Sequence, residues 1–144
     1  MLVSAPLRSN VNLSRLVRLA GCAGITQIIH SGTGKVDREI ARDAAEHVRI
    51  LTHRSLPPVL DRLKSDGYCC VGLEQTTESN CLYDFIFPYR TALVIGSERE
   101  GLSQEILDRL DAVVEIPVYG VPASLNVVTA ATMAVYEYCR QHHQ

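Results

Sequence analysis

Two short, almost wholly apolar runs constrain the fold of this 144-residue chain more than any other feature. They are GYCCVGL, residues 67–73, and TALVIG, residues 91–96. A strand that is apolar on both faces is typical of the interior of a parallel sheet with helices on each side. Such runs alternate along the chain with segments of helical periodicity. The pattern predicts an α/β fold in which a parallel sheet is the middle of three layers.

The remaining elements follow from periodicity and capping residues. Leu13, Leu16, Val17 and Ala20 recur at helical spacing, and Asp37 is placed as the N-cap of a later helix. We expect additional strands over residues 1–5, 25–30, 48–51 and 112–117, the third of them at an edge of the sheet. Helices are expected over residues 12–23, 37–47, 55–66, 103–110 and 124–140.

Composition limits the class of protein. The chain is 47% hydrophobic and 21% charged, so we expect residues 1–144 to fold as a single domain without an RNA-recruiting extension. No apolar run approaches the roughly 20 residues that span a bilayer, and no leader is recognisable, so a cytoplasmic location without membrane contact is expected. The five cysteines are odd in number and form no CxxC pair, which predicts neither a disulfide framework nor a metal site.

The net charge of −2 hides an asymmetry. Residues 1–64 hold ten Lys and Arg against five Asp and Glu, whereas residues 65–144 hold four against eleven. The first half could face phosphate, and its arginines could equally be ordinary solvated charges. Charge alone therefore leaves the partner open.

Topology predicts where a ligand binds. The loops at residues 96–103 and 117–124 both follow predicted parallel strands, and ligands of open α/β sheets bind beyond the carboxyl ends of the strands. Other motifs are weaker. SGTGK, residues 31–35, lacks the first glycine and the final hydroxyl residue of a Walker A loop, so Gly32 and Gly34 are interpreted as turn residues. No GxGxxG follows a strand, and Glu98-Arg99-Glu100 is typical of a solvated loop.

Three longer segments, taken together, are more specific. They are NVNLSRLVRLAGCAG at residues 10–24, LVIGSEREGLS at 93–103 and IPVYGVPASLNVVTAATMAVYEY at 116–138. In order and spacing they resemble the motifs of the SpoU/TrmH family of RNA ribose 2′-O-methyltransferases, within the SPOUT superfamily. The resemblance extends over about residues 2–140. It departs from the family pattern at Ser14, where glycine is usual, and at Ser97, where asparagine is usual.

The resemblance implies an alpha/beta knot fold, with a carboxy-terminal trefoil knot that binds S-adenosylmethionine. It implies methylation of a ribose 2′-hydroxyl in tRNA or rRNA, without a metal. The implied cofactor-binding residues are Leu73, Gly96, Ser97, Glu98, Gly101, Ile116, Val118, Ser124, Leu125 and Asn126. The implied catalytic residues are Arg18, Asn12, Glu98, Ser124 and Asn126.

The chemistry of these side chains suggests the role that each is expected to have. Arg18 matches the arginine proposed as general base in the family, but an arginine side chain keeps its proton at neutral pH, which favours clamping phosphate and polarising the hydroxyl, with the proton leaving through Ser124 or water. Both roles stay open. Leu125 is expected to contact adenine, and Glu98 to fix Arg18 or a loop amide.

The resemblance also implies a homodimer through the knot and the last helix, in which first-motif residues approach the partner's cofactor. Residues 127–138 are apolar over more of the helix circumference than one-sided burial requires, which agrees with such a dimer. The alternative is a non-catalytic knotted module that serves in RNA binding or in assembly. The RNA, the nucleotide and any protein that recruits the RNA are not specified by these motifs.

Overall fold

A computed structural model describes residues 1–143, and within them seven strands form one sheet in the order β3-β2-β1-β6-β4-β7-β5. Every neighbouring pair of strands is parallel. The strands are β1 (Leu2–Ser4), β2 (Gln27–Ser31), β3 (Arg49–His53), β4 (Cys69–Leu73), β5 (Asn80–Cys81), β6 (Thr91–Ile95) and β7 (Ala112–Glu115). The helices are α1 (Asn10–Cys22), α2 (Arg38–Ala41), α3 (Ala44–His47), α4 (Pro57–Ser65), α5 (Gln104–Leu107) and α6 (Val127–His142).

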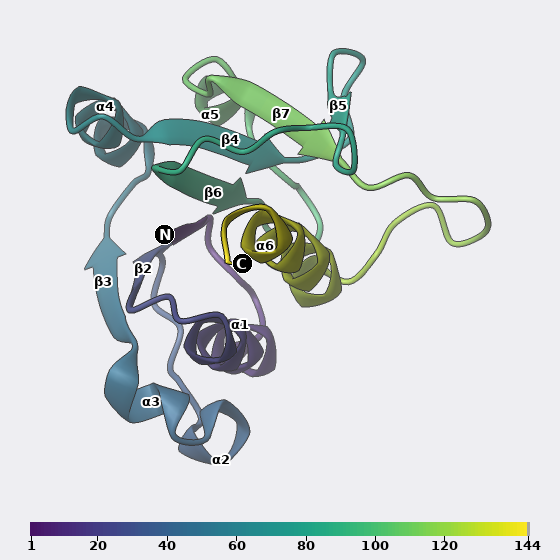
Figure 1. Ribbon diagram of the computed structural model, residues 1–144. Coiled ribbons are helices and arrows are strands. Elements are labelled where there is room, and N and C mark those ends of the chain that lie inside the picture. The colour runs from purple at the N-terminus through teal and green to yellow at the C-terminus, as the bar shows by residue number, and fades with distance from the viewer. Residues whose placement is uncertain (144) are drawn as a thin grey trace.

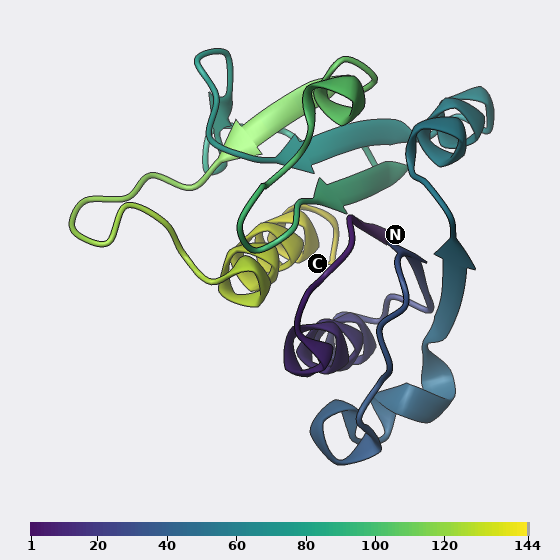
Figure 2. The same ribbon diagram turned by 180° about the vertical axis from the view of Figure 1, so that it is seen from behind.

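Helices cover both faces of the sheet. Along β6 the side chains alternate, with Leu93 and Ile95 packing on the α1 and α6 side and Ala92 and Val94 packing on the α4 and α5 side. The helices α1 and α6 lie next to each other on one face (Figure 1) and contact each other directly. Figure 2 shows the same sheet from behind, with the 117–126 loop projecting from one side of the molecule. The predicted three-layer α/β fold is confirmed, and β6 and β4 are interior strands as their apolar sequences indicate.

Three predictions about the elements were wrong: one helix is split in two, one helix begins later than expected, and one strand was missed. The helix expected over residues 37–47 is two short helices, because Arg42 adopts a φ of +57° and ends α2, although Asp37 does cap α2 by accepting from the Glu39 amide. The last helix begins at Val127, so Ser124 lies in the loop before it. The two-residue strand β5 was not predicted, since Asn80 and Cys81 carry no strand pattern.

The other expected elements are present within a few residues of their predicted limits. Gly32 has a φ of +124°, so its role as a turn residue is confirmed. In the part of the chain that the structure describes, no helix has both the length and the apolar character needed to cross a membrane.

Candidate active site

A cleft of about 490 Å³ opens at the carboxyl ends of β4, β6 and β7. Parallel strands bring these ends to one edge of the sheet, which is why segments distant in the sequence meet there. The cleft lining includes every residue that the resemblance assigned to the cofactor: Leu73, Gly96, Ser97, Glu98, Gly101, Ile116, Val118, Ser124, Leu125 and Asn126. Four polar or charged residues that sequence reasoning did not select also line it: Glu74, Gln75, Arg99 and Glu115.

The loop after β6 is a tight turn closed on itself. The main chains of Ser97 and Gly101 exchange two hydrogen bonds, with N···O distances of 3.2 and 3.1 Å. A Cβ at Gly96 would overlap the backbone of Gly101, and Gly101 itself has a φ of +63°. Glycine is therefore required at both positions for the turn to close.

Glu74 supports this turn from the end of β4. Its carboxylate accepts hydrogen bonds from the backbone amides of Leu102, at 2.9 Å, and Gln75, at 3.0 Å. A Cβ at Gly101 would overlap the same carboxylate. Glu74 was missed from sequence because only its position, directly after a buried strand at the ligand edge, could have identified it.

Glu98 anchors α1 to the cleft. Its carboxylate accepts from the amides of Arg8 and Ser9 at 2.9 and 3.2 Å, and from Asn12 Nδ2 at 3.1 Å. Burial raises the pKa of Glu98, but the hydrogen bonds from Arg8, Asn12 and Ser9 outweigh burial and leave the pKa below its usual value. Glu98 therefore holds loop amides, as one of the two sequence-based expectations had it, and Arg18 is not among its partners.

Asn12 and Asn126 continue this connection. Asn126 Nδ2 donates to Asn12 Oδ1 at 3.4 Å, and Asn126 Oδ1 accepts from the amides of Val128 and Thr129 as the N-cap of α6. We call the three side chains Glu98, Asn12 and Asn126 the amide relay. The relay joins the start of α1, the 96–103 loop and the start of α6, so it orders the cleft wall.

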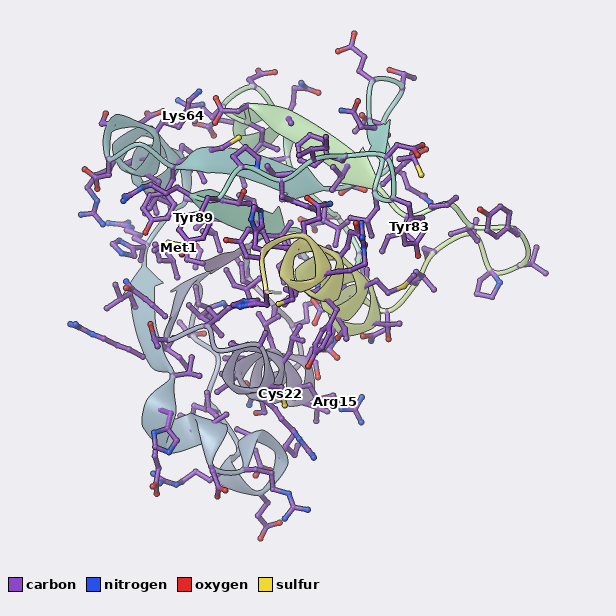
Figure 3. The ribbon with its side chains drawn as sticks, in the orientation of Figure 1. Met1, Arg15, Cys22, Lys64, Tyr83 and Tyr89 are labelled. Atoms are coloured by element: carbon purple, nitrogen blue, oxygen red, sulfur yellow. The ribbon has the colours of Figure 1, made fainter. Side chains whose placement is uncertain are left out.

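Arg18 lies outside the cleft of its own chain. It is exposed on α1, on the same helix face as Arg15 and Cys22, and has no hydrogen-bond or ion-pair partner within residues 1–143. Arg15, labelled in Figure 3, extends from the side of α1 that faces away from the sheet. Within one chain Arg18 therefore does not meet the residues assigned to the cofactor, and its expected approach to the cofactor of a partner chain stays a prediction.

The two departures from the family pattern have local structural roles. Ser14 is buried, where its hydroxyl donates to the Asn10 carbonyl at 2.6 Å and accepts from the Asp37 amide at 2.8 Å. Ser97 Oγ accepts from the Glu100 amide at 3.3 Å, inside the turn. Among the residues described, no group of three His, Cys, Asp or Glu side chains is arranged to hold a metal ion.

The sequence was compared with protein families and known structures. Residues 1–136 match the SpoU rRNA methylase family. The chain belongs to this family.

Relatives of this SpoU-family chain include a tRNA (guanosine(18)-2′-O)-methyltransferase of Mus musculus, 40% identical over 82 residues, which are 57% of this chain. Those residues are 5% of the mouse protein, and the chain spans 55% of a TrmH-family tRNA/rRNA methyltransferase relative from Staphylococcus haemolyticus. The chain therefore covers about half the length, or less, of these curated relatives.

Two solved structures share the fold closely. The A. aeolicus TrmH/SpoU tRNA modifying enzyme aligns with a TM-score of 0.93 at 26% identity, covering 98% of this chain and 74% of the other. The SpoU methyltransferase AviRb from Streptomyces viridochromogenes, solved with AdoMet, aligns with a TM-score of 0.83 at 27% identity, covering 97% and 59%.

Proposed function

We propose that this SpoU-family chain transfers a methyl group from S-adenosylmethionine to a ribose 2′-hydroxyl of tRNA or rRNA. The observation that carries the proposal is the cleft at the carboxyl edge of the sheet, which gathers the ten residues assigned to the cofactor from separate segments. A matching fold in a SpoU methyltransferase solved with AdoMet supports the same cofactor.

The chemistry of the cleft suits this cofactor. Ile116, Val118 and Leu125 offer apolar surface for an adenine, and the turn at Ser97 to Gly101 offers backbone groups for a ribose. Leu125 is 41% exposed, so its side chain has apolar surface free for a ligand. When bound, S-adenosylmethionine supplies a methyl group on a positively charged sulfur, which the ribose oxygen accepts.

The amide relay has a positioning role in this proposal. Both oxygens of Glu98 already accept hydrogen bonds and its pKa is low, so Glu98 is a poor proton acceptor. Asn12 and Asn126 are held by the same bonds. Arg18, whose planar guanidinium suits a phosphate and a hydroxyl, is then the group that clamps the RNA. As the ribose oxygen takes the methyl group from the sulfur, its proton leaves to Ser124, which lines the cleft, or to water.

We further propose that the active unit is a homodimer, in which Arg18 of one chain reaches the cleft of the other. Two observations support it: Arg18 lies outside its own cleft, and the 117–126 loop exposes Tyr119 by 93% and Val121 by 97%. Large apolar side chains this exposed are typical of an interface. The trefoil knot implied by the family belongs to the same proposal, and the chain trace of a crystal structure tests it.

Cofactor binding and methyl transfer test the function. S-adenosylmethionine should raise the melting temperature of the full chain, because a ligand that binds the native state stabilises it. Leu125→Asp should abolish that shift by placing a carboxylate against the adenine. Ile86→Asp is the matched control, since Ile86 is 83% exposed and does not line the cleft.

Incorporation of tritiated methyl groups into bulk RNA then distinguishes the methyltransferase from the non-catalytic module. Transfer to RNA that contains free 2′-hydroxyls supports the methyltransferase. A thermal shift without transfer, on RNA from several sources, supports the non-catalytic module. A Leu125→Asp protein with an unchanged shift would place the cofactor elsewhere.

A further inference from the structure

A second cleft, of about 650 Å³, lies at the opposite edge of the sheet from the candidate active site. Gln27, Tyr68 and Arg90 line it from the amino ends of β2, β4 and β6, and Arg62 and Asp66 line it from the end of α4. Met1, which also lines it, is labelled in Figure 3 on the side of the molecule away from the 117–126 loop. Neither the sequence motifs nor the proposed reaction uses this cleft.

One cation in this cleft is already held in place. The guanidinium of Arg90 lies over the Tyr68 ring, with Cζ 4.5 Å from the ring centroid, and Arg90 Nη2 donates to the Asp66 carbonyl at 2.9 Å. Stacking and one hydrogen bond fix the plane of the group and leave its other N–H donors free. An arginine ordered in this way loses less conformational entropy when it binds an anion.

The charge of the cleft is not neutralised by ion pairs. Lys64 and Arg109, which lie near it, pair with Asp111 and Asp61 at 3.4 Å each. Within residues 1–143, neither Arg62 nor Arg90 has a carboxylate oxygen within ion-pair distance.

The positive charge extends beyond the cleft. Arg49 begins β3 beside Gln27 at the same edge of the sheet. Asp66 is the one acidic residue that the cleft lining contains, against two arginines. The cleft lining together with Arg49 therefore carries more positive than negative side chains and is open to an anionic partner.

We propose that this arginine cleft, formed by Arg62, Tyr68 and Arg90, binds the phosphate backbone of the RNA at a point distant from the reacting ribose. The proposal rests on the proposed function, which makes RNA the partner. Five-residue strands separate the two edges by about 16 Å, a distance that a folded RNA exceeds. A guanidinium fork matches phosphate oxygens, and its exposed face can stack on an unpaired base.

Binding of fluorescently labelled bulk tRNA, measured by anisotropy over a range of salt concentrations, tests the arginine cleft in the full chain. Arg62→Gln/Arg90→Gln should weaken binding several-fold. It should also make the negative slope of log affinity against log salt shallower by about one for each arginine. Arg62→Lys/Arg90→Lys should restore most of the slope, because lysine also neutralises a phosphate. Lys64→Gln/Arg109→Gln removes the same charge from two side chains that do not line the cleft and are already ion-paired, and is the matched control.

The outcomes are distinct from those of the cofactor experiment. A slope unchanged in the glutamine variant, or an equal loss in the Lys64→Gln/Arg109→Gln control, overturns the proposal even if the wild type methylates RNA. The expected loss in a protein that shows no response to S-adenosylmethionine supports the cleft and overturns the proposed enzyme. Where methyl transfer occurs, the KM for RNA should rise in the glutamine variant while kcat at saturating RNA stays unchanged.

Discussion

At the scale of single residues, His30 is a polar side chain that is buried without any hydrogen bond among the described residues. It is 1% exposed in β2, and neither ring nitrogen has a hydrogen-bond partner within residues 1–143. Burial lowers the pKa of His30, because a charged imidazolium there would lose its hydration. The folded protein therefore holds His30 neutral at pH values where an unfolded histidine begins to protonate.

This arrangement predicts a pH-dependent stability. The unfolded state binds the proton from about pH 6.5 downward, so the free energy of unfolding should fall as pH drops from about 7.5 to 5.5. His30→Leu removes the titrating ring and keeps an apolar side chain of similar size. Chemical denaturation at several pH values should give a flatter dependence for the variant. An equal slope in both proteins would assign the effect to other histidines.

Gly101 carries a second prediction. Gly101→Ala should cost about 1–2 kcal/mol from the left-handed backbone alone, and more from overlap with the Glu74 carboxylate. Because the turn forms a wall of the cleft, the thermal shift caused by S-adenosylmethionine should shrink as well. Gly120→Ala is the control, since nothing lies within 4 Å of a Cβ at that position. Comparable stability and cofactor response in the two variants would contradict this account.

The sequence predicts which residues line the cleft, but not which groups form hydrogen bonds with them. The ten residues assigned to the cofactor meet in one cleft because parallel strands end at one edge, which topology anticipates. The partners of Glu98, in contrast, are two backbone amides and Asn12, which no local pattern encodes. For Arg18 the motif identifies the residue, but a single chain does not contain the groups that it would act on, because Arg18 lies outside the cleft of its own chain.

At the scale of elements, the interior strands were the easiest to predict and the breaks between helices the hardest. Burial on both faces makes β4 and β6 apolar throughout, which the sequence displays directly. The break at Arg42 interrupts a segment, residues 37–47, that contains neither glycine nor proline, so no helix-breaking residue marks it in the sequence. The start of α6 depends on Asn126 and its contact with Asn12, whereas Ser124 is an equally good cap by residue type.

The cap of α6 can be tested as an element. Asn126→Ala should lower the free energy of unfolding by about 1–2 kcal/mol, since the cap hydrogen bonds to Val128 and Thr129 are lost. It should also weaken the response to S-adenosylmethionine, because the amide relay is broken. Ser103→Ala removes the cap of α5, at Ile106, and leaves the relay intact. A cofactor response lost equally in both variants would show that the relay has no special role.

At the scale of the whole molecule, the separation of Arg18 from its own cleft predicts complementation between chains. Arg18→Ala and Leu125→Asp proteins should each be inactive in methyl transfer. The first lacks the arginine that acts on the RNA, and the second cannot bind the cofactor. After mixing and exchange of subunits, mixed dimers hold one complete site. Activity should then recover to about a quarter of the wild-type value, because about half of the dimers are mixed and each has one working site.

Two controls complete this experiment. Sedimentation of the wild type should show a dimer at micromolar concentration, and each variant alone should stay inactive at every concentration. A mixture without activity, from variants that exchange subunits, would place Arg18 in the cleft of its own chain or remove it from the reaction.

The amide relay also determines how much of the chain must be synthesised before the cleft can form. Asn12 lies 86 residues before Glu98 and 114 residues before Asn126, so its hydrogen bonds span most of the chain. A polypeptide still being synthesised has the start of α1 long before it has the start of α6. Until residue 126 and the helix after it have left the ribosome, the cleft lacks a wall. We therefore expect a chain that ends before α6 to show no thermal response to S-adenosylmethionine, because it lacks Asn126 and the cleft wall that Asn126 orders.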